Sequence, residues 1–159
     1  MKDFIRTSLV AVFKFFRIEQ SEEQTDNLVQ FIQFCAVGVT NTVISYLLNI
    51  GTLKILEPYQ LTWDYVAGNL VAFFLSVLWS FYWNNKYVFT QKDGEKRNIV
   101  RTLLKTYISY GFTGIVLTNI LSFIWVDILG ISKYIAPIIN LIISVPLNFI
   151  INKKWAFKG

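Results

Sequence analysis

The sequence has no histidine and only one cysteine, Cys35, among its 159 residues. Without histidine, the chain lacks a common zinc ligand and the most frequent general base, and one cysteine cannot form an intramolecular disulfide. It also lacks the GxxxxGK[ST] and GxGxxG loops that bind phosphates. No catalytic constellation is recognisable, so we expect a protein that is not an enzyme and that uses no cofactor or metal.

Charged side chains are also scarce. They make up 16% of the chain, against about 25% in ordinary soluble domains, whereas apolar residues make up 54%. The charges crowd into short stretches and leave four uncharged runs, at residues 28–53, 65–85, 106–126 and 134–152. Each run approaches or exceeds the roughly 20 residues with which a helix crosses the hydrocarbon of a bilayer. The sequence therefore predicts an all-α membrane protein with four transmembrane helices; a soluble helical bundle is the alternative.

The positive charges lie almost entirely on one side of the predicted helices. If the helices alternate in direction, all but two of the 15 Lys and Arg share one side, the exceptions being Lys54 and Lys133. By the positive-inside rule, both termini should be cytoplasmic in a multi-pass protein of a bacterial cytoplasmic membrane. This topology explains the net charge of +5, so nucleic acid is not an expected partner.

Residues 1–27 should form a cytoplasmic segment ahead of the transmembrane domain. Apolar side chains share one face of a helical wheel and basic residues lie opposite, which predicts an amphipathic helix in the membrane interface. A partly ordered basic tail is the alternative. Lys14 and Arg17 interrupt the apolar stretch, which is not typical of a secretory signal. Residues 19–27 are polar and should form a linker with helix-start character before the first transmembrane helix.

The transmembrane domain, residues 28–159, resembles two copies of one helical hairpin, at about 28–90 and 99–158. A shift of 68 residues lays the second run on the fourth and aligns FYWNNKYVF (81–89) with FIINKKWAF (149–157), and a shift of 73 lays the first run on the third. We call these two aligned phrases the exit phrases. Each copy should begin and end on the cytoplasmic side, so the repeats should be parallel and related by an axis along the membrane normal.

Small or polar residues recur at every fourth position and form a seam along each predicted helix. The candidate seam residues are Asn41, Ser45, Ser76, Ser80, Asn140, Ser144 and Asn148. Small and hydroxyl residues also let membrane helices pack closely, so packing and a polar track both remain open for the serines. A polar cavity is favoured for the asparagines, because a carboxamide in hydrocarbon needs partners.

The exit phrases place cations at the cytoplasmic level of the lipid headgroups. There a lysine can reach a phosphate while its aromatic neighbours lie in the membrane interface. The candidate lipid-phosphate-binding residues are Asn84, Lys86, Asn152, Lys154, Arg101 and Lys105. Anchoring to ordinary anionic lipid is the alternative interpretation of these lysines.

The stretch FCAVGVTNTVISYLL at residues 34–48, together with both exit phrases, resembles the GtrA-like family of small bacterial four-helix membrane proteins. The resemblance covers about residues 30–157. The family's Phe-x-x-x-Gly and the asparagine after it correspond to Phe34, Gly38 and Asn41. The family's Asn-x-x-Asn-x-Lys/Arg-aromatic-x-Phe phrase corresponds to Asn148, Asn152, Lys154, Trp155 and Phe157. In the first repeat Ser80 stands in place of the leading asparagine of that phrase.

This resemblance implies a flippase that moves undecaprenyl phosphate, or its monosaccharide conjugate, across the membrane. The implied partners are a polyprenyl-phosphate-linked sugar lipid and membrane glycosyltransferases that decorate O-antigen, teichoic acid or another cell-wall polysaccharide. The movement should be independent of an energy source, because the chain has no ATP-binding motif and the four runs contain no acidic residue.

Two other functions remain open. A non-transporting subunit that holds a polytopic glycosyltransferase in place would have a large apolar interface and no lipid-phosphate site. A small-multidrug-type exporter needs a carboxylate within the membrane, so this alternative requires that Asp64 or Asp127 be buried. Because four thin helices enclose little volume, a homodimer is one of the working units that we consider.

Overall fold

The computed structural model describes residues 2–15, 20–61, 64–91, 97–132 and 135–158. Within these ranges every regular element is helical, which confirms the predicted all-α class for this part of the chain. Two stretches are long and apolar enough to cross a membrane, Glu22–Tyr59 and Val66–Val88. They coincide with the first two predicted transmembrane helices.

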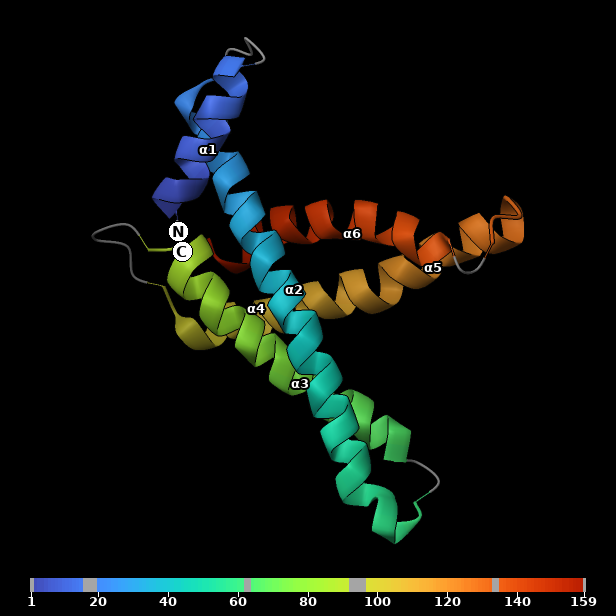
Figure 1. Ribbon diagram of the computed structural model, residues 1–159. Coiled ribbons are helices and arrows are strands. Elements are labelled where there is room, and N and C mark those ends of the chain that lie inside the picture. The colour runs from blue at the N-terminus through green and yellow to red at the C-terminus, as the bar shows by residue number, and fades with distance from the viewer. Residues whose placement is uncertain (1, 16–19, 62–63, 92–96, 133–134, 159) are drawn as a thin grey trace.

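The chain starts with α1 (Lys2–Phe15), which lies beside the first turns of α2 (Glu22–Leu56) (Figure 1). Ser21 caps α2 by a capping box, in which its hydroxyl accepts from the Gln24 N–H and its own N–H donates to the Gln24 side chain. Residues 22–27 are therefore helical. The capping box agrees with the helix-start character predicted for residues 19–27, and the helix begins before its apolar part.

The first hairpin packs α3 antiparallel to α2. After α2 come η1 (Glu57–Tyr59), α3 (Asp64–Trp83) and the π-helical segment η2 (Asn84–Val88). Gly68 allows the two helices to approach closely, because a Cβ at this position would lie 3.1 Å from Nδ2 of Asn49. The Asn49 amide donates to Oδ1 of Asn69 across the same interface, at 2.9 Å.

The second hairpin is less regular. Its elements are α4 (Ile99–Gly111), η3 (Phe112–Leu117), α5 (Thr118–Phe123), η4 (Ile124–Ile128), α6 (Ala136–Ile151) and η5 (Asn152–Ala156). The segments η3, η4 and η5 are π-helical, a geometry that often marks functional positions. Asn98 caps α4 by accepting from the Arg101 N–H, and Pro146 lies inside α6.

The two hairpins meet at one end and diverge toward the other (Figure 1). They meet around an apolar core that consists of Phe34, Val37, Phe81, Val88, Phe89, Phe149, Ala156 and Phe157. Phe89 and Phe157, the last residues of the two exit phrases, stack with ring centroids 4.6 Å apart. Their backbone N–H groups donate to the carbonyls of Asn84 and Asn152, so the two exit phrases also share a local backbone geometry.

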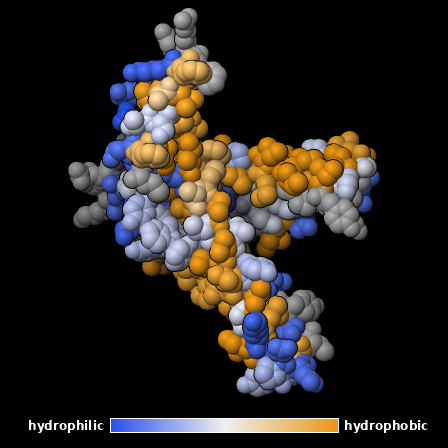
Figure 2. Space-filling view, in the orientation of Figure 1, coloured by the Kyte–Doolittle hydropathy of each residue, from blue (hydrophilic) through white to orange (hydrophobic). Residues whose placement is uncertain are grey.

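Apolar side chains cover much of the outer surface of both hairpins. Figure 2 shows hydrophobic residues along both diverging arms, with hydrophilic residues gathered near α1 and at the far tip of the first hairpin. On α2, for example, Val39, Val43 and Leu47 are all more than half exposed. A water-soluble chain rarely exposes so large an apolar area, whereas a bilayer accommodates it.

Candidate functional site

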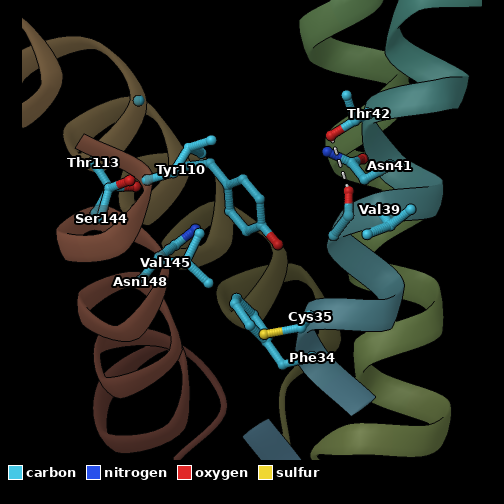
Figure 3. A pocket seen from close by; sticks show the side chains of 13 residues that line it. Phe34, Cys35, Val39, Asn41, Thr42, Tyr110, Thr113, Ser144, Val145 and Asn148 are labelled. Atoms are coloured by element: carbon cyan, nitrogen blue, oxygen red, sulfur yellow. Dashed lines mark hydrogen bonds between the residues drawn. The ribbon is translucent and has the colours of Figure 1, made fainter. Parts of the chain in front are cut away.

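A groove with several polar side chains in a mainly apolar lining lies between the two hairpins. It consists of two hollows, of 440 and 520 Å³, that have Asn41, Thr42, Tyr110 and Gly114 in common. Figure 3 shows Asn41 on one wall, Ser144 and Asn148 on the opposite wall, and the ring of Tyr110 between them. We call this site the inter-hairpin groove.

Five of the seven candidate seam residues line this groove: Asn41, Ser45, Ser76, Ser144 and Asn148. The carboxamide oxygen of Asn41 is buried and has no hydrogen-bond partner among the described residues. A buried acceptor without a partner is costly, so this position suits a ligand that donates a hydrogen bond. That any of the five contacts a ligand stays a prediction.

Asn140 lies within the second hairpin and makes several hydrogen bonds. Its Oδ1 accepts from Nε1 of Trp125 at 3.1 Å, and its Nδ2 donates to the Ser122 hydroxyl at 2.7 Å. A longer bond of 3.4 Å reaches the carbonyl of Thr118. These contacts join α6 to the helix before it, so for Asn140 the structure favours packing over a polar track.

Ser80 is fully buried at the contact between the hairpins. Its hydroxyl lies 2.6 Å from the Tyr110 hydroxyl, and Asn84 Nδ2 donates to Ser80 at 3.0 Å and to Tyr110 at 3.5 Å. Tyr110 thus joins α4 to α3 while its ring lines the inter-hairpin groove. Sequence reasoning missed this residue, because one tyrosine within an apolar run gives no sign of the residue that it will meet.

The two candidate asparagines of the exit phrases, Asn84 and Asn152, have no exposed surface. Asn152 Nδ2 donates to the backbone carbonyl of Asn148 at 2.8 Å, and since a carbonyl only accepts, this bond fixes the orientation of the amide. The side-chain oxygens of both residues are buried without a partner in the described part of the chain. A phosphate also has only acceptors, so this placement does not favour either residue as a phosphate ligand.

The four candidate cations have different surroundings. Lys86 is exposed, its Nζ 3.3 Å from the Tyr82 hydroxyl. Lys105 donates to the carbonyl of Trp155 at 2.9 Å and so contacts the second exit phrase. Arg101 and Lys154 are exposed, and their side chains make no hydrogen bond or ion pair within the described ranges.

A neighbouring lysine that the sequence did not single out, Lys153, ties the second exit phrase to α2. Its Nζ donates to the Gln30 side chain at 2.6 Å and also to Asn27. Burial lowers the pKa of Lys153, an effect that the nearby carboxylates of Glu23 and Asp26 oppose. These contacts hold the second exit phrase against α2, so the ammonium of Lys153 is less available to a ligand than that of Lys154.

The described residues offer hydrogen-bonding groups rather than catalytic ones. Among them, no three His, Cys, Asp or Glu side chains cluster in a way that could hold a metal ion. No acidic side chain in these ranges is buried: Asp127 is exposed, and Asp64 is half-buried at the first residue of α3. The site can therefore bind polar groups by hydroxyl, carboxamide and ammonium groups.

Residues 33–157 match the family described as GtrA/DPMS, transmembrane domain. The chain belongs to this family. The match confirms the resemblance seen in the sequence, and with the two long apolar helices it makes the chain a membrane protein. Every candidate seam and phosphate-binding residue lies within the matched range.

Three relatives are similar over most of their length. Cell wall teichoic acid glycosylation protein GtcA from Listeria monocytogenes serovar 1/2a is 27% identical over 134 residues, which are 84% of this chain and 88% of the relative. GtcA from Listeria innocua serovar 6a has the same identity and coverage. The uncharacterized membrane protein YngA from Bacillus subtilis is 25% identical over 126 residues, or 79% of this chain and 77% of YngA. No solved structure matches the chain.

Proposed function

We propose that this protein moves the headgroup of a sugar linked to undecaprenyl phosphate across the bacterial cytoplasmic membrane, for the glycosylation of a cell-surface polymer such as teichoic acid. The observation that carries the proposal is the inter-hairpin groove, which brings polar side chains from both hairpins together in a chain whose outer surface is apolar. The name of the GtcA relatives supports the link to a cell-wall polymer. Membrane glycosyltransferases would use the delivered sugar, and the protein itself would catalyse no reaction.

The groove would lower the desolvation cost of moving the headgroup through the membrane. A sugar phosphate is rich in hydroxyls and charged, and its transfer into hydrocarbon without partners costs many kcal/mol. Hydroxyls and carboxamides from both hairpins would replace part of its hydration. Because the arms diverge, the headgroup could occupy the groove while its long apolar chain stays in lipid (Figure 1).

The proposal includes a topology. Helices α2 and α3 would be the first two membrane spans, α4 to η4 the third and α6 the fourth, as two parallel hairpin repeats with both termini in the cytoplasm. Helix α1 would lie in the cytoplasmic interface. Support comes from the basic side chains at the end where the hairpins meet, which include Lys86, Lys105, Arg101 and Lys154.

A liposome assay tests this function. Purified protein is reconstituted alone, and the movement of a labelled undecaprenyl-phosphate monosaccharide between leaflets is followed. We expect wild-type protein to exceed empty vesicles clearly and Asn41→Leu to be about tenfold slower, equivalent to the loss of roughly one hydrogen bond in the transition state. Asn119→Leu is the matched control, because Asn119 is exposed and, within the described ranges, its amide donates only to the Ile115 carbonyl one turn earlier.

Wild-type protein that moves the lipid no faster than empty vesicles would reject this function and favour the scaffold. In that case the apolar arms would serve to bind a polytopic glycosyltransferase or a second copy of this chain. The exporter is less favoured, because the carboxylate that proton coupling requires is not buried at either Asp64 or Asp127.

A further inference from the structure

A second groove lies between α2 and α3 and shares no lining residue with the inter-hairpin groove. Its volume is 430 Å³, and its lining is almost wholly apolar. One wall consists of the rings of Trp79, Trp83 and Tyr87, with Trp79 edge-on to Trp83 and Trp83 stacked on Tyr87, at 5.4 Å in each case. The opposite wall is the turn of α2 around Val37. We call this site the aromatic groove.

The aromatic groove has a polar end. Thr40 accepts a hydrogen bond from the Trp79 indole, which fixes the register of the antiparallel helices. Two turns before Thr40, Gln33 therefore lies level with Tyr87, at the end where the hairpins meet. Gln33 lines the groove, is 3% exposed, and its carboxamide makes no hydrogen bond within the described residues.

Two more donors lie near the same end. The Nε1–H of Trp83 is buried and has no hydrogen-bond partner in the ranges that the structure describes. The ammonium of Lys86 lies 5.8 Å from the centre of the Trp83 ring and 5.3 Å from that of Tyr87. A cation and two unpaired N–H donors next to an apolar channel match an amphiphile with an anionic oxygen-rich head and one apolar chain.

We propose that the aromatic groove is a capture site for the lipid carrier, in which the first isoprene units lie against Trp79 and Trp83 while Lys86, Gln33 and the Trp83 indole bind the phosphate. This inference rests on the proposed function and adds the place where the carrier docks. It separates two tasks: the aromatic groove holds the phosphate and chain, and the inter-hairpin groove passes the polar headgroup.

The second repeat does not duplicate this groove. At the shift of 68 residues, Leu147 and Ile151 stand in place of Trp79 and Trp83. Lys154, the counterpart of Lys86, contacts no ring within the described residues. The site therefore takes one lipid per chain, and Lys158, an exposed lysine just after the second exit phrase, supplies a control variant.

Binding of radiolabelled undecaprenyl phosphate to purified protein in detergent tests the site. We expect Lys86→Gln and Gln33→Leu each to weaken binding about tenfold, and Trp83→Phe, which keeps a ring but removes the N–H, to weaken it less. Lys158→Gln, which removes an exposed charge outside every candidate site, should bind like wild type. Undecaprenol, which lacks the phosphate, should bind weakly and equally to wild type and to Lys86→Gln. Lys86 is exposed, so its replacement leaves the fold intact.

Two binding results would overturn the inference. In the first, Lys86→Gln and Gln33→Leu bind undecaprenyl phosphate as tightly as wild type. In the second, wild type binds phosphatidic acid as tightly as undecaprenyl phosphate, which would make the groove a site for ordinary anionic lipid. Wild-type protein that translocates the lipid, with rates unaffected in these variants, would reject the capture site alone. Wild-type protein without translocation would reject the function itself.

Discussion

Asn41 and Asn140 carry the same side chain in opposite hydrogen-bonding situations. Asn140 is almost fully buried, and its bonds to Trp125, Ser122 and Thr118 use both of its amide atoms. The oxygen of Asn41 is buried without a partner among the described residues, at the centre of the inter-hairpin groove. The first arrangement stabilises a hairpin, whereas the second leaves hydrogen-bonding capacity for a ligand.

Replacement of each asparagine by alanine should separate these roles. Asn140→Ala leaves the Trp125 and Ser122 groups unpaired, so we expect the free energy of unfolding in detergent to fall by about 1–2 kcal/mol, with the transport rate per folded molecule unchanged. Asn41→Ala should have nearly wild-type stability and slower transport. Equal loss of stability in both variants, with transport intact, would mean that Asn41 also serves packing.

Four-residue spacing decides which side chains share a helix face, and the groove accordingly contains Asn41 and Asn148. That the seam contacts a ligand stays a prediction. The sequence could not predict that Tyr110 lies among these residues, since that depends on α4 meeting Ser80 on α3. Nor could it predict the burial of Asn152, whose amide turns back to bond the carbonyl one turn earlier.

The helices α3 and α6 end in the same way. Both continue into a π-helical segment, η2 and η5, and each segment is followed by a phenylalanine whose N–H bonds to an asparagine carbonyl. The stacked rings of Phe89 and Phe157 then join the two hairpins. The guanidinium of Arg97 lies over the Phe157 ring at 5.4 Å and donates to the Phe89 carbonyl at 2.8 Å, which adds a polar tie.

Truncation of this stack should loosen the joint between the hairpins. Phe157 is 3% exposed, so we expect Phe157→Ala to lower the free energy of unfolding by about 3–4 kcal/mol, as a large cavity in a buried aromatic cluster does. Trp155→Ala removes a ring that is 42% exposed and should cost less than half as much. Thermal or denaturant unfolding in detergent measures both. Equal losses of unfolding free energy in both variants would contradict the claim that the Phe89–Phe157 stack holds the two hairpins together.

At the scale of elements, the exit phrases could be recognised as equivalent because the spacing of asparagine, lysine and phenylalanine repeats in them. The π-helical geometry could not be predicted, since hydrophobic periodicity does not distinguish one extra residue in a turn. The first helical stretches of the two hairpins also differ. The stretch Glu22–Leu56 is one uninterrupted α-helix, whereas Ile99–Ile128 contains two π-helical segments.

The whole molecule combines an apolar exterior with a groove that contains several polar side chains. The two hairpins are held together at the aromatic core and diverge beyond it, which leaves the inter-hairpin groove between them (Figures 1 and 2). Uncharged runs in the sequence indicate long helices, but not the angle between them. That angle depends on how side chains such as Phe34 and Phe149 pack, at 5.5 Å between ring centroids, and no periodic pattern encodes it.

The only cysteine of the chain, Cys35, lines the inter-hairpin groove, and this allows a direct test of the central claim. The measurement is the rate of undecaprenyl-phosphate-sugar movement in liposomes before and after a bulky maleimide is attached to Cys35, with the extent of labelling read by mass spectrometry. Our account predicts that labelled wild-type protein falls to the rate of empty vesicles, whereas Cys35→Ser is unaffected by the reagent. Fully labelled protein that keeps the unlabelled rate would contradict the inter-hairpin groove as the path of the headgroup.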